Sequence, residues 1–256
     1  MLFRSQPNRF SRSIIYGYFP PGVKWLLIIN IGIYILLDVA ARLSGNPIAF
    51  EINKRALFEL SAVAVLKNLL LWQFVTYLFI HGGIWHLVMN MLMLWMFGTT
   101  LEQTWGTRQF LKYYFICGVG AGICVVLINA AVGDWGVPTL GASGAIMGLL
   151  LAFGVLFPDM TVLMGFLFPM KAKYMVMIFA AVELYSTLGP NTGISSVAHL
   201  GGMLVGYIYL KGPMPRFRFL HLPDLGGWYR QWRMQRAKKK FQVYMRKQGG
   251  RGPWVN

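Results

Sequence analysis

Six long apolar segments constrain what this chain can fold into more than any other feature. They lie at about residues 25–43, 84–101, 110–132, 142–157, 173–189 and 194–210. A helix of about 20 apolar residues crosses the hydrocarbon core of a bilayer. The charged fraction of 12% is about half that of an average soluble domain, so too few charges remain to cover a water-exposed surface. The sequence therefore predicts an all-α membrane protein, a bundle of six transmembrane helices.

The charge distribution predicts how the bundle is oriented. Net charge is +4 over residues 1–24, +1 over residues 25–210 and +11 over residues 211–256. Basic loops stay in the cytoplasm, and six spans place both basic ends there. A seventh span within residues 56–80 would move the strongly basic end outside. We therefore expect that stretch to be an interfacial part of the first outer loop, residues 44–83.

Three regions follow from these patterns. We expect a basic cytoplasmic N-terminal segment at 1–23, a membrane domain at 24–211 and a basic cytoplasmic tail at 212–256. Within the tail, Trp228–Lys247 is either an amphipathic helix on anionic lipid or a solvated basic segment, and both alternatives stay open. Basic ends that flank apolar spans favour the lipid bilayer over nucleic acid as a partner. With no visible organelle-targeting signal, we expect a prokaryotic cell membrane.

Three of the predicted spans carry polar residues near the same end. His86 and Asn90 share one face of the second span, Ser143 begins the fourth, and His199 lies early in the sixth. Polar groups are costly within hydrocarbon, so each needs a reason. All three spans run from outside to inside, which puts these groups roughly 3–10 Å below the outer edge. The sequence thus predicts one polar layer on the outer side.

The residue types in this layer suit acyl-transfer chemistry. A serine nucleophile needs a base, which a neutral histidine supplies. Two pairs of glycines give the fourth and sixth spans faces of small residues, along which the two helices could pack closely; they are Gly141 and Gly144, and Gly202 and Gly206. Ordinary helix packing would explain either pair alone. An oxyanion would find donors in the Ser143 N–H, the Asn90 amide and the His86 imidazole. We expect no carboxylate near His199, which leaves a Ser–His dyad.

Three motifs in this order resemble those of the rhomboid intramembrane serine proteases. GASGAIMG at 141–148 looks like their GxSG nucleophile motif, AHLGGMLVG at 198–206 resembles AHxxGxxxG, and HLVMN at 86–90 resembles HxxxN. Two departures are Gln73 after Trp72, where an arginine is frequent, and Met147, where some bacterial members have tyrosine.

The resemblance implies a six-helix fold with Ser143 as nucleophile and His199 as general base and acid. It implies His86, Asn90 and the Ser143 amide as oxyanion donors, with no cofactor and no metal. The expected reaction is hydrolysis of peptide bonds in single-span or multi-span membrane proteins near the outer face. Substrate would enter between spans two and five, and Ser186–Gly193 could flex as a gate.

Two other functions remain as alternatives. A catalytically silent rhomboid-like protein would bind membrane clients without needing Ser143 or His199. A transporter would need polar groups through the inner half of the bundle, where the second, fourth and sixth spans are almost wholly apolar. For Glu183, Glu102 and His81 we expect structural hydrogen bonds, and three histidines without an HExxH motif argue against zinc.

Overall fold

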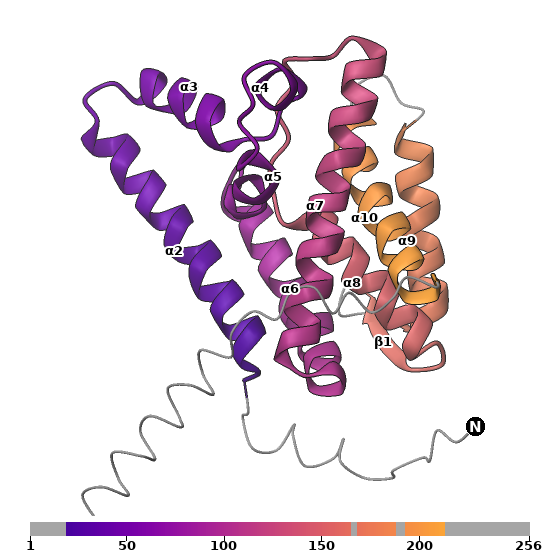
Figure 1. Cartoon of the computed structure of the whole chain (residues 1–256). Helices are drawn as coiled ribbons and strands as arrows, with labels where there is room; N and C mark the ends of the chain where they lie inside the picture. Colours follow the sequence, from indigo (N-terminus) through magenta and orange to yellow (C-terminus); the bar gives the residue numbers. More distant parts are fainter. Residues whose placement is uncertain (1–18, 165–167, 188–192, 213–256) are drawn as a thin grey trace, which may run out of the picture. The chain divides into compact units, whose positions relative to one another are not determined.

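A helix lies at each of the six predicted apolar segments (Figure 1). The computed structural model describes residues 19–164, 168–187 and 193–212. The six helices are α2 Pro21–Leu43, α6 Ile84–Trp105, α7 Thr107–Val132, α8 Ser143–Leu156, α9 Ala172–Thr187 and α10 Gly193–Lys211. Three of them, α2, α6 and α7, are long and apolar enough to cross a membrane, and α8 is a shorter apolar helix. The predicted tail helix Trp228–Lys247 lies outside the described residues.

The short helix α8 lies at the centre of the bundle. It packs against α6, α7, α9 and α10, and ten of its 14 residues are buried. A helix that is apolar on every side belongs in a protein core or in lipid, and the burial of α8 shows that other helices surround it. Its first residue, Ser143, is therefore held among four other helices.

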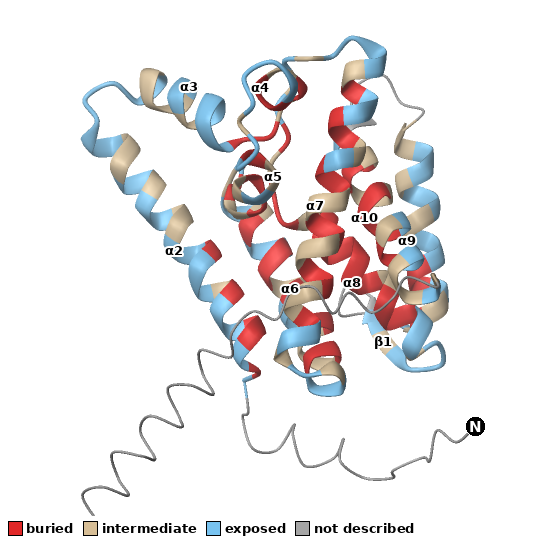
Figure 2. Cartoon of the chain, viewed as in Figure 1, coloured by how far each residue is buried: buried red, intermediate tan, exposed pale blue. Residues whose placement is uncertain are grey.

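The helix α2 has the opposite environment (Figure 2). Its buried residues are confined to its first ten positions: Gly22, Val23, Leu26 and Asn30. The remainder exposes large apolar side chains, and Leu36 for example is 66% exposed. A soluble protein rarely exposes so continuous an apolar surface. Lipid tails would cover this face of α2 without the cost that water imposes.

The segment between α2 and α6 forms short helices. These are α3 Pro47–Phe58, α4 Ala62–Leu66, α5 Gln73–Thr76 and the 3-10 helix η1 Tyr77–Phe79. Gln73 is fully buried and holds the segment together, since it donates to the Ala56 carbonyl at 2.8 Å and accepts from the Ser61 N–H at 3.2 Å. Tyr77 fastens the segment to α7 through a 2.6 Å bond from its hydroxyl to the Gly118 carbonyl. This loop is thus a packed part of the fold.

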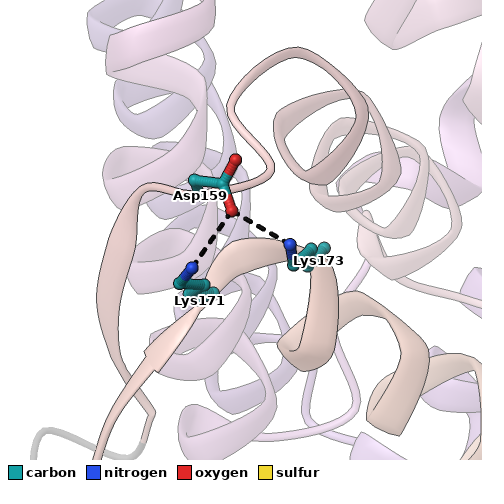
Figure 3. Close-up of polar contacts among 3 residues, drawn as sticks. All are labelled: Asp159, Lys171 and Lys173. Carbon is teal, nitrogen blue, oxygen red and sulfur yellow. Dashed lines mark hydrogen bonds and ion pairs between the residues drawn. The ribbon is translucent and has the colours of Figure 1, made fainter.

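A β-hairpin joins α8 to α9, which the sequence pattern did not predict. Strands β1 Thr161–Met164 and β2 Phe168–Lys171 pair antiparallel. Beside them, Asp159 accepts hydrogen bonds from Lys173 at 2.9 Å and Lys171 at 3.3 Å (Figure 3). The hydrogen bond from Lys173, and after it the one from Lys171, lowers the pKa of the exposed Asp159 carboxyl. The pairs join the end of α8 to the beginning of α9.

Glu102 fastens three helices together at one end of the bundle. Its carboxylate, which comes from α6, accepts the N–H groups of Gly22 and Val23 at 2.7 Å each. It also accepts the Thr107 hydroxyl of α7 at 2.7 Å. The first N–H groups of a helix have no partner within it, and no side chain caps α2 locally. Glu102 therefore acts as the cap of α2 from a different helix, as expected for a structural carboxylate.

We predict that Glu102→Gln destabilises the bundle by roughly 1.5–3 kcal/mol, because the glutamine NH₂ would face one of the two backbone donors and the other would lose its charged acceptor. Thermal unfolding in detergent would measure the loss. Glu51→Gln is the matched control, since the Glu51 side chain is 44% exposed and its contact with Lys54 is a partly exposed ion pair. Equal unfolding temperatures for the two variants would show that Glu102 has no such structural role.

Candidate active site

Ser143 and His199 are in hydrogen-bond contact. The Ser143 Oγ lies 2.7 Å from the His199 Nε2, across the interface between α8 and α10. Ser143 is the first residue of α8, and His199 lies in the second turn of α10. The two residues are 56 positions apart in the chain, so helix packing alone brings them together.

Glycines allow this close approach of α8 to α10. A Cβ on Gly202 would collide with the backbone carbonyl of Gly144, and backbone atoms cannot swing aside. A Cβ on Gly144 would lie 2.8 Å from the Ala121 Cβ of α7 and 3.2 Å from the Ala198 carbonyl oxygen. Gly206 contacts α7 instead, where Tyr113 and Cys117 occupy the space a side chain would need. Direct backbone contact at Gly144 and Gly202 therefore sets the spacing of the two helices.

Gly141 shapes the turn that leads into Ser143. Its φ of +110° is a conformation that residues with a side chain rarely adopt. Its N–H donates to the Tyr77 carbonyl at 2.8 Å, which connects the turn to the packed loop. A Cβ at this position would lie 2.8 Å from the His86 imidazole. Gly141 thus makes room for His86, and a Cβ there would also lie 3.8 Å from the Ser143 Oγ.

His86 and Asn90 lie on the α6 side of this cluster. The Gly82 N–H donates a long 3.4 Å bond to the His86 Nδ1, which favours the neutral tautomer with its proton on Nε2. Nε2 and Cε1 are the His86 atoms nearest to Gly141. Asn90 is 5% exposed and donates through Nδ2 to the His86 carbonyl at 2.8 Å. The amide group carries two hydrogens, so one N–H remains for another acceptor.

His81 packs its edge against the His86 ring, with 5.3 Å between ring centroids. It precedes α6 and is almost fully buried. Burial, followed by the neighbouring His86, lowers the pKa of His81 to about 4. A neutral His81 ring therefore supports His86 at neutral pH.

One expectation from the sequence was wrong, because a carboxylate does lie beside His199. Glu183 of α9 places its Oε1 2.8 Å from the His199 Nδ1. A carboxylate within an apolar span was the available signal. The pairing itself depends on how α9 is rotated against α10, which no local pattern reveals.

Within the described residues no group of three His, Cys, Asp or Glu side chains could hold a metal ion.

The bundle and its Ser–His contact define a multi-pass helical membrane protein with a candidate nucleophile and base. Residues 69–213 match the family description "Rhomboid domain", and the chain belongs to the rhomboid family. It is 33% identical over 161 residues to "Rhomboid protein 1, mitochondrial" of Saccharomyces cerevisiae, covering 59% of this chain and 45% of that protein. It is 26% identical over 210 residues to "Rhomboid-like protease 3" of Toxoplasma gondii, covering 81% and 73%.

A human relative, "Presenilin-associated rhomboid-like protein, mitochondrial", is 33% identical over 135 residues, which cover 52% of this chain and 35% of the relative. The chain thus spans less than half the length of the yeast and human relatives, and about three quarters of the Toxoplasma protein.

We predict that Gly202→Ala separates α8 from α10 and lowers stability by about 1–3 kcal/mol, as overpacking does in a tight interface. The unfolding temperature in detergent would report it. Gly32→Ala is the matched control, because a Cβ at Gly32 on α2 meets no atom within 4 Å. A Gly202 variant as stable as the Gly32 variant would contradict the backbone contact.

Proposed function

We propose that this chain is an intramembrane serine endopeptidase that cleaves transmembrane substrates with Ser143 and His199. The observation that carries the proposal is the 2.7 Å contact between Ser143 Oγ and His199 Nε2 at the first turn of α8. Membership in the rhomboid family supports it, as does a relative named as a protease. A catalytically silent client-binding protein would have no use for this contact.

Catalysis begins when His199 Nε2 accepts the proton of Ser143 as Oγ attacks the substrate carbonyl. The imidazolium then delivers that proton to the leaving amine, and an acyl-enzyme forms. A water molecule attacks the acyl-enzyme in the second half, with His199 again as base. The C-terminal part of the substrate leaves first, and hydrolysis returns Ser143 to its starting state.

The oxyanion would be stabilised by N–H groups gathered at the beginning of α8. The first N–H groups of a helix have no intrahelical acceptor, and α8 has no side-chain cap at Ala142. The Ser143 N–H is therefore available. His86 contributes its Nε2–H, and Asn90 contributes the amide hydrogen that its bond to the His86 carbonyl leaves free.

The same proposal includes a topology. Six crossings by α2, α6, α7, α8, α9 and α10 would place both basic ends in the cytoplasm, following the distribution of basic residues. Ser143 and His199 would then lie just below the outer surface, where water can reach them. Substrates would be membrane proteins that enter laterally between α6 and α9. Most of the predicted gate, Ser186–Gly193, lies outside the described residues.

We predict that Ser143→Ala and His199→Ala each reduce cleavage of a purified single-span test substrate to the uncatalysed background. Labelling by a fluorophosphonate probe should disappear in both variants, because it needs the activated hydroxyl. Ser195→Ala is the matched control, since Ser195 is an exposed serine on the same helix as His199. Cleavage by Ser143→Ala at the parent rate would exclude this mechanism.

We predict that Asn90→Ala lowers kcat by roughly 10- to 1000-fold, the range for loss of one oxyanion donor. Its folded fraction is checked by unfolding in detergent, because the variant also loses the bond to the His86 carbonyl. A kcat that equals the parent value in folded protein would remove Asn90 from the oxyanion site.

A further inference from the structure

Glu183 is a charged side chain that the mechanism above does not use. It lies within α9, whose neighbouring residues Val182 and Leu184 are more than half exposed on the outer face of the bundle. The Glu183 side chain is only 15% exposed and turns toward α10. A carboxylate held within an apolar span is costly, so an inward orientation toward polar partners requires a reason.

The partners of Glu183 both come from α10. Its Oε1 lies 2.8 Å from the His199 Nδ1, and the Ser196 side chain also interacts with its carboxylate. Ser196 is buried and lies three residues before His199, so both partners share one face of α10. The carboxylate therefore lies next to the imidazole, with both of its partners on one helix.

The contact with His199 is close in distance but imperfect in direction. The Nδ1–H does not point at Oε1 within the angular range of a hydrogen bond, although the two atoms are 2.8 Å apart. Catalytic hydrogen bonds are often poorly aligned before substrate binds and tighten when it does.

A carboxylate at this position would decide where the imidazole proton lies. An acceptor beside Nδ1 favours the tautomer with the proton on Nδ1. The lone pair of Nε2 then faces the Ser143 hydroxyl at 2.7 Å, as a general base requires. When Nε2 takes the serine proton, the negative charge of Glu183 stabilises the imidazolium, and the effect is larger away from water.

We propose that Glu183 is a positioning residue for His199, so that the site is a Ser143–His199–Glu183 triad. The inference rests on the proposed function. Glu183 makes no contact with the Ser143 hydroxyl; it acts through the orientation and charge of His199. No further proton transfer is required, since the carboxylate stays ionised throughout.

The test compares Glu183→Gln and Glu183→Asp with the parent protein in detergent, measuring kcat, KM and the rate of fluorophosphonate labelling. We expect Glu183→Gln to lower kcat and the labelling rate together by roughly 10- to 1000-fold with KM unchanged, because the amide removes the charge but leaves substrate binding intact. Glu183→Asp, which keeps the carboxylate, should recover part of that loss.

Glu102→Gln is the matched control. Glu102 is also a buried carboxylate, but its partners are backbone N–H groups and Thr107. The Glu102→Gln variant should lose stability, while its kcat per folded molecule stays at the parent value. A Glu183 that is merely structural would behave in the same way, and that result would overturn the proposal.

The remaining outcomes are equally decisive. A parent kcat in folded Glu183→Gln, or equal kcat values for the Gln and Asp variants, would overturn the triad. If Glu183→Gln does not fold, Glu183→Asp decides: an unchanged kcat with the shorter side chain overturns the proposal, and a lower kcat with unchanged KM supports it. Ser143→Ala in the same assay separates the two proposals, since cleavage that does not need Ser143 rejects the serine mechanism itself.

Discussion

The backbone contact between Gly144 and Gly202 is the constraint on which the rest of the site depends. Helices in lipid gain nothing from burying apolar side chains, so they associate through close packing and polar contacts. Without side chains at these two positions, α8 and α10 approach until backbone meets backbone. That approach carries Ser143 to 2.7 Å from His199, a distance that larger side chains at the interface would not permit.

Several polar side chains within the helices find backbone partners inside the bundle. The Asn30 amide donates to the Leu26 backbone carbonyl one turn earlier, and the Asn90 amide donates to the His86 backbone carbonyl. Glu102 takes up the unpaired N–H groups of α2. The cluster at Ser143, His199 and Glu183 likewise draws its members from three helices, α8, α10 and α9. Such a cluster exists only in the assembled bundle, so folding and the assembly of the site are one event.

The sequence predicted the features that depend on local pattern. Apolar length located all six helices, and polar residues at matching depths singled out Ser143 and His199. Glu183 was expected to be structural because it matches no catalytic motif. It lies sixteen residues before His199 on another helix, and only the rotation of α9 against α10 shows which face it occupies. The hairpin of β1 and β2 was missed for a related reason, since two four-residue strands leave little periodic signal.

Under the proposed mechanism, the position of Glu183 would link substrate entry to the charge beside His199. The Ser143–His199 contact belongs to α8 and α10, which Gly144 and Gly202 hold together, whereas Glu183 belongs to α9. If α9 moves outward to admit a substrate, the proposed triad loses its carboxylate while the serine and histidine stay in contact. The base would be fully oriented only after α9 returns. Closure of the entry route and activation of the nucleophile would then be the same movement, which restricts the reaction to substrates that have entered the bundle.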